Sequence, residues 1–139
     1  MDPKMVHLLN QALADEHMAI AQYLHHYNQV RSKFTDVIDH FQEHMADEQG
    51  HAKELADRIY ALKGKPNSTI EGFAEYTEDL DTALKQDVEA EGKAIALYTE
   101  ILKYAESVED QATVMMLEAI LDDERKHQDE FLKMLGEPR

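Results

Sequence analysis

Length, composition and charge narrow the classes of protein to which this chain can belong. Its 139 residues include 29 Asp and Glu against 14 Lys and Arg, which gives a formal net charge of −15, and no cysteine or tryptophan. The length suits one domain that buries roughly 70% of its unfolded surface. Without cysteine, disulfide scaffolds, thiolate zinc sites, iron–sulfur clusters and cysteine nucleophiles are excluded. The acidic balance disfavours nucleic acid as a partner and favours small cations.

The chain has no segment that looks like a membrane span or a secretion signal. No run approaches 18 apolar residues, and the first residues form a polar helix start rather than the apolar part of a signal peptide. We therefore expect a cytoplasmic protein with no membrane partner. The 43% of apolar residues, with only 5 Gly and 3 Pro, indicate a packed helical chain rather than a disordered one.

The three prolines, at positions 3, 66 and 138, leave two long stretches that suit helices. Apolar spacing predicts one domain over residues 1–139 with four helices, at about 3–33, 35–63, 80–106 and 109–135. The first begins at Asp2 and Pro3 and ends near residues 31–33. The second ends at Gly64, which we expect to adopt a left-handed capping conformation.

The link between the second and third helices is the only long one. Its 15 or so residues can span about 50 Å when extended, and a 28-residue helix is about 42 Å long. The links near residue 34 and at 107–110 are short, so the helices they join should be antiparallel neighbours. The sequence therefore predicts an all-α fold, a ferritin-like antiparallel four-helix bundle with one long crossover between helices 2 and 3.

Acidic and imidazole side chains interrupt the apolar stripe of every predicted helix. They are Glu16, Glu48, His51, Glu91, Glu124 and His127. Each would cost several kcal/mol if it were buried as an unpaired charge, on the order of the penalty measured for isolated ions. One Glu from each of two helices and a Glu-x-x-His from each of the other two is the arrangement of carboxylate-bridged di-metal sites. Such ligands suit iron or manganese, and zinc can occupy them too.

The two halves of the sequence repeat this pattern. Glu16 and Tyr23 are seven residues apart, and so are Glu91 and Tyr98. The halves therefore resemble two copies of one helical hairpin. We expect each tyrosine to donate a hydrogen bond to the glutamate of the opposite half. Other histidines are expected to be solvated rather than metal ligands, namely His7, His17, His25, His26 and His40.

Segments along nearly the whole chain resemble the bacterioferritin family. The resemblance is carried by residues 8–10, 16, 21–23, 47–51, 64–67, 87–91, 115–118 and 123–127. It implies that the six residues above are ferroxidase ligands, with Glu48 and Glu124 as the bridges of an intrasubunit di-iron site. It also implies that Fe(II) is oxidised there by O₂ or H₂O₂ and that the ferric product is stored inside a hollow shell. The expected function is thus ferroxidase activity with iron storage or detoxification.

Two departures from the family pattern concern haem and assembly. Family members carry a methionine, which binds haem across a dimer axis, where this chain has Gln49. Met45, one turn earlier, is an alternative haem ligand, although helical methionines usually fill gaps in packing. The chain also stops after the fourth helix, whereas typical members add a short fifth helix at the four-fold axes of a 24-subunit cage. We therefore expect a homo-oligomer that is a dodecamer or a dimer rather than a 24-mer.

Other functions stay open at this point. A rubrerythrin-like peroxidase or a manganese catalase would use the same ligand set. Against the peroxidase, Ala94 stands where rubrerythrins carry an extra carboxylate, and no cysteine is present to bind a rubredoxin iron. The non-enzymatic alternatives are an iron buffer and a haem-bearing electron carrier in which the metal pair is structural.

Overall fold

The computed structural model describes residues 1–30, 35–70, 72 and 74–136. It contains four α-helices, α1 (Pro3–Gln29), α2 (Thr35–Ala61), α3 (Leu80–Ser107) and α4 (Gln111–Gly136). These bounds lie close to the predicted ones, except that α1 already ends at Gln29. The predicted end at 31–33 and the short link near residue 34 lie outside the described residues. No helix in the described ranges is long and apolar enough to span a membrane.

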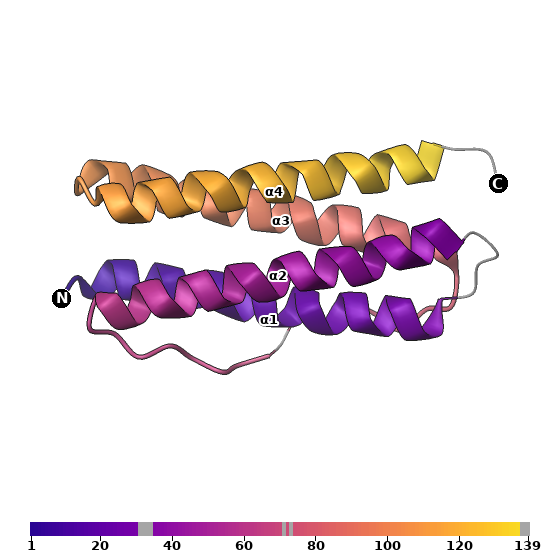
Figure 1. Ribbon diagram of the computed structural model, residues 1–139, viewed down its shortest axis with the longest axis horizontal. Coiled ribbons are helices and arrows are strands. Elements are labelled where there is room, and N and C mark those ends of the chain that lie inside the picture. Colours follow the sequence, from indigo (N-terminus) through magenta and orange to yellow (C-terminus); the bar gives the residue numbers. More distant parts are fainter. Residues whose placement is uncertain (31–34, 71, 73, 137–139) are drawn as a thin grey trace.

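The four helices form an antiparallel bundle, as predicted. Figure 1 shows α1 and α2 side by side as one hairpin and α3 and α4 as another. Across the bundle α1 packs on α3 and α2 packs on α4, so every contacting pair is antiparallel. Because α2 ends at the opposite end of the bundle from the start of α3, the crossover runs along the bundle's length (Figure 1).

Helix α2 ends in a capping motif that differs from the prediction. The left-handed residue is Lys63, with φ of 66°, and not Gly64. The Lys63 N–H donates to the Tyr60 carbonyl and the Gly64 N–H donates to the Ile59 carbonyl, both at 2.9 Å, which is a Schellman arrangement. Gly64 is required for a different reason, because a Cβ there would lie 2.6 Å from a methyl group of Val6 on α1.

Two apolar clusters fill the bundle, and a polar layer separates them. One cluster includes Leu9, Leu55 and Ile101, and the other includes Phe41 and Phe131. The six charged or imidazole residues predicted to interrupt the apolar stripes lie between these clusters, each 0 to 4% exposed. The fold therefore supports a buried polar centre with packed apolar side chains on both sides along the bundle axis.

Candidate metal centre

All six residues predicted as metal ligands lie together in this polar layer. They form two groups whose candidate ligand atoms lie within 4.8 Å of one another. The groups are Glu16, Glu48, His51 and Glu124, and Glu48, Glu91, Glu124 and His127. Glu48 and Glu124 belong to both groups, which is the placement that bridging carboxylates need. Each hairpin supplies one glutamate from its first helix and a Glu-x-x-His from its second.

Both histidines direct the Nδ1 atom toward the carboxylates. His51 Nδ1 lies 3.0 Å from Glu124 Oε1, and His127 Nδ1 lies 3.2 Å from Glu48 Oε1. The facing atoms without a hydrogen-bond partner in the described part of the chain are Glu16 Oε2, Glu48 Oε1, His51 Nδ1, Glu91 Oε2, both oxygens of Glu124, and His127 Nδ1. Buried polar atoms are rarely left unpaired. This donor set fits a pair of divalent ions that would accept all of these lone pairs.

Burial and mutual repulsion raise the pKa of three glutamates of the metal-free centre, Glu48, Glu91 and Glu124, so these carboxylates tend to keep their protons. Burial raises the pKa of Glu91 and that of Glu124 to about 8. Burial and the nearby Glu16 raise the pKa of Glu48 well above its ordinary range. Burial alone would lower the pKa of His127, but contact with Glu91 raises it to about 9. Metal ions would have to displace these protons, so binding should strengthen with rising pH.

Each histidine is oriented from behind by an aspartate of the opposite hairpin. His51 Nε2 donates to Asp123 Oδ2 at 2.8 Å, and His127 Nε2 donates to Asp47 Oδ2 at 2.9 Å. Such outer contacts fix the ring orientation and leave Nδ1 free for a metal. Sequence reasoning did not single out these two aspartates. The signal was present, because each directly precedes a Glu-x-x-His motif.

The two tyrosines bind the centre's other glutamates in the same reciprocal way. The Tyr98 hydroxyl donates to Glu16 Oε1 at 2.5 Å, and the Tyr23 hydroxyl donates to Glu91 Oε1. Burial and the nearby carboxylates raise the pKa of both phenols well above 10, so both remain donors. Each of these two glutamates thus has one oxygen held by a phenol, and the other has no hydrogen-bond partner among the described residues.

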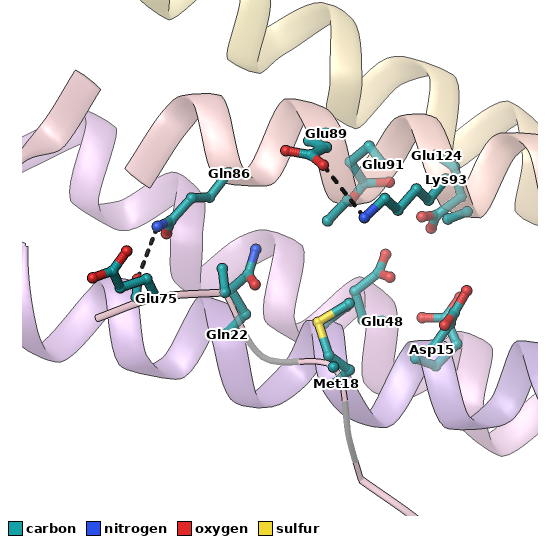
Figure 2. Close-up of a pocket in the computed structure, with 16 residues that line it drawn as sticks. Asp15, Met18, Gln22, Glu48, Glu75, Gln86, Glu89, Glu91, Lys93 and Glu124 are labelled. Atoms are coloured by element: carbon teal, nitrogen blue, oxygen red, sulfur yellow. Dashed lines mark hydrogen bonds and ion pairs between the residues drawn. The ribbon is translucent and has the colours of Figure 1, made fainter. Parts of the chain in front are cut away.

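A cavity of about 500 Å³ opens on this centre between α1, the crossover and α3. Its walls include Asp15, Glu75 and Glu89, together with the buried Glu48 and Glu124 of the centre. In Figure 2 the Glu48 carboxylate from α2 points toward Glu91 and Glu124. The acidic lining gives the cavity a field that attracts cations.

The histidines expected to be solvated behave differently from one another. His7 is exposed, while His17 and His25 are half-buried. The expectation is wrong for His26, which is 1% exposed and donates to Asp87 Oδ2 at 2.9 Å. Its partner is 61 residues away in the sequence, so helix periodicity alone could not reveal it.

Met45 and His44 are neighbours on α2 with different surroundings. Met45 is half-buried and packs against the apolar cluster that contains Phe41 and Phe131. His44, which sequence reasoning did not consider, is 2% exposed, and its ring stacks on that of His127 with centroids 4.1 Å apart. It donates from Nε2 to Glu130 at 2.6 Å.

Comparison with known proteins gives the family of the chain. A family model described as a ferritin-like domain matches residues 6–139. The bacterioferritin of Mycobacterium bovis is 32% identical, and the match covers 98% of this chain and 90% of that protein. The bacterioferritin of Desulfovibrio desulfuricans is 29% identical over 89% of this chain and 70% of its own length.

Solved structures agree with the family and the fold. A ferritin-like, diiron-carboxylate protein from Bacillus anthracis superposes with a TM-score of 0.91 at 29% identity, covering 97% of this chain and 99% of that one. Rhodobacter capsulatus bacterioferritin, described with a metal-free dinuclear site and a haem iron, superposes with a TM-score of 0.89 at 28% identity, covering 98% and 86%. The fold, the reciprocal arrangement of the site and these matches lead to one conclusion: the chain belongs to the bacterioferritin family of ferritin-like proteins.

Proposed function

We propose that the protein is a ferroxidase that takes Fe(II) as its substrate and passes its electrons to O₂ or H₂O₂. The observation that carries the proposal is the pair of overlapping ligand groups that share Glu48 and Glu124. Two ions held by these shared carboxylates would lie close enough to act together on one oxidant molecule. The family membership of the chain supports iron as the metal.

The remaining residues of the centre position these ligands. Tyr23 and Tyr98 each hold one oxygen of a glutamate, and Asp47 and Asp123 each hold the outer nitrogen of a histidine. The acidic cavity would raise the local concentration of Fe(II) at the opening. No side-chain nucleophile is required, because the chain's part is to bind and orient the ions.

Storage of the ferric product and assembly into a homo-oligomer, either a dodecamer or a dimer, extend the same proposal. The diiron-carboxylate relative from Bacillus anthracis, which matches along 99% of its own chain, supports the prediction of a di-iron site. Gel filtration measures the assembly, and iron counted per subunit after aerobic Fe(II) loading measures storage. About two irons per subunit would indicate the site alone, and hundreds per assembly would indicate a mineral core.

The central experiment removes either Glu48, which belongs to both ligand groups, or His127, which belongs to one. Glu48→Ala and His127→Ala should each abolish rapid Fe(II) oxidation, followed by stopped-flow absorbance, while circular dichroism still reports four helices. The matched control is Glu118→Ala, which removes an exposed carboxylate of α4. Oxidation at the wild-type rate in both site variants would overturn the ferroxidase proposal.

Metal analysis tests the manganese catalase, one of the two other enzyme candidates with this ligand set. Stoichiometric manganese in the purified protein, with rapid O₂ evolution from H₂O₂, would favour a manganese catalase. Iron with slow O₂ evolution would favour the ferroxidase.

Haem binding through Met45 stays a prediction. The Rhodobacter capsulatus relative contains haem iron. A Soret band in the native protein that disappears in Met45→Leu would support Met45 as the ligand, and a spectrum without that band would remove haem from the proposal.

A further inference from the structure

A second cluster of potential metal ligands lies next to the six-residue centre. His40 and His44 are four residues apart on α2, so both project from the same side of that helix. Glu130 of α4 faces them across the α2–α4 contact. Its Oε2 atom lies 2.6 Å from His44 Nε2 and 3.6 Å from His40 Nδ1. The three candidate ligand atoms all lie within 4.8 Å of one another.

Part of this cluster lacks hydrogen-bond partners. The Nδ1 atom of His40 is buried and has none among the described residues, although Glu43 Oε2 lies 3.4 Å and Glu130 Oε2 lies 3.6 Å from it. His44 is 2% exposed, so its ring is fixed among protein atoms. Two imidazoles and one carboxylate on two rigid helices make a set in which a bound ion would satisfy the open nitrogen.

We propose that His40, His44 and Glu130 form a third metal site, which binds one divalent transition-metal ion per chain. Two nitrogen donors and one carboxylate favour ions such as Zn²⁺, Co²⁺ or Fe²⁺ over Ca²⁺ and Mg²⁺, which prefer oxygen ligands. Glu43 supplies a further oxygen at the edge of the site. With it, residues 40–44 have the spacing His-x-x-Glu-His, in which the two histidines of some zinc enzymes bind the metal.

The third site shares no residue with the six-residue centre but touches it. His44 stacks on His127, with the two ring planes 19° apart, so one imidazole of each site forms the boundary between them. The side chains of His40 and Glu130 are 34% and 45% exposed, whereas the six residues are almost fully buried. An ion can therefore reach the third site from solvent without passing through the acidic cavity.

The test counts ions at the third site after the six-residue centre has been disabled. Glu48→Gln combined with Glu124→Gln removes both shared carboxylates. We expect this double variant to bind one Co²⁺ per chain, measured by its visible absorption and by equilibrium dialysis. Adding His40→Gln should weaken that binding at least about tenfold, since loss even of an outer-shell contact costs about 10- to 100-fold. Adding His7→Gln, which removes an exposed histidine of α1, should change nothing.

The outcomes separate this proposal from the ferroxidase one. No Co²⁺ binding by the double variant, or binding that His40→Gln leaves unchanged, would overturn the third site and leave the ferroxidase proposal untouched. If the double variant loses its helical circular dichroism, the same comparison is made in the wild-type background. There three ions per chain should fall to two in His40→Gln, and an unchanged count would overturn the proposal.

Discussion

Tyr98 of α3 donates its phenol hydrogen bond to Glu16 of α1, across the boundary between the two hairpins. Tyr23 of α1 donates to Glu91 of α3 in the reverse direction. The two hydrogen bonds occupy equivalent positions in the two halves of the internal repeat. Each fixes one oxygen of a glutamate and leaves the other oxygen facing the centre.

Replacing Tyr98 by Phe should impair the centre while the fold survives. The phenol oxygen is lost, so Glu16 can rotate away from its position. Loss of an outer-shell contact of this kind costs about 10- to 100-fold in metal affinity or activity. The measurements are the Fe(II) oxidation rate and the Zn²⁺ affinity. Tyr60→Phe, at a 78% exposed tyrosine, is the control, and equal rates in both variants would contradict a positioning role for Tyr98.

The stability of the metal-free protein should fall as pH rises from about 5 to 9. In the folded chain Glu91 and Glu124 keep protons up to about pH 8 rather than their ordinary 4.5. His127 keeps its proton up to about pH 9 rather than 6.5. The unfolded chain binds fewer protons throughout this window, so the free energy of unfolding decreases with pH.

Thermal unfolding of the metal-free protein at pH 6 and pH 9 tests this prediction, with a lower midpoint expected at pH 9. The double variant Glu91→Gln with Glu124→Gln should show a weaker dependence, because two of the titrating groups are gone. Adding Zn²⁺ should raise the midpoint more at pH 8 than at pH 6. A metal-free protein more stable at pH 9 than at pH 6 would refute the assigned protonation.

The buried hydrogen-bond network around Asp87 should be a major contributor to stability. Asp87 accepts from Gln22 at 2.8 Å and from His26 at 2.9 Å, and the other nitrogen of His26 faces Gln86 Oε1 at 3.0 Å. The network therefore ties Gln22 and His26 of α1 to Asp87 and Gln86 of α3 inside the bundle.

Asp87→Ala should destabilise the fold by about 1–3 kcal/mol for each donor left without a partner. Urea unfolding measures the loss. Glu100→Ala, an exposed position of the same helix, is the control. A loss no larger than the control's would mean that water replaces the carboxylate at no cost.

Gly64→Ala should destabilise the contact between the end of α2 and α1. The added Cβ would meet two methyl groups of Val6, at 2.6 and 2.8 Å, and overpacking of this kind costs about 1–3 kcal/mol. Val6→Ala in the same chain should recover much of the loss by opening space. Gly50→Ala, where an added Cβ meets no atom of the described residues within 4 Å, should instead stabilise helix α2 by about 0.5–1 kcal/mol. Denaturation midpoints of these variants check the contrast.

The fold was predictable because its signals are local. Long proline-free stretches with helical apolar spacing indicate the helices, and link lengths indicate which helices are antiparallel. The left-handed residue at the end of α2 is Lys63, one position before the predicted Gly64. Gly64 is needed instead for its close packing against Val6, which sequence spacing does not reveal. Glu109, in the turn before α4, has a φ of 58°. This left-handed backbone conformation is likewise one that the propensity of a non-glycine residue does not favour.

The six residues of the centre were predictable because glutamate and histidine occupy positions that the helical spacing assigns to the apolar face. Their partners were harder to find, since Asp123 lies 72 residues from His51 and Glu130 lies 86 residues from His44. Periodicity identifies the inner face of each helix but not which residue of another helix lies opposite. That pairing depends on the axial offset of α2 against α4, which only the packed structure supplies.

The contacts between the hairpins have the character of an isologous interface within a single chain. Tyr23 and Tyr98 exchange equivalent bonds across it, and Asp47 and Asp123 do the same. None of the six candidate ligands lies between residues 61 and 80. A polypeptide cut in the crossover would therefore keep the full ligand set as two complementary fragments, and neither fragment would hold a complete ligand group alone.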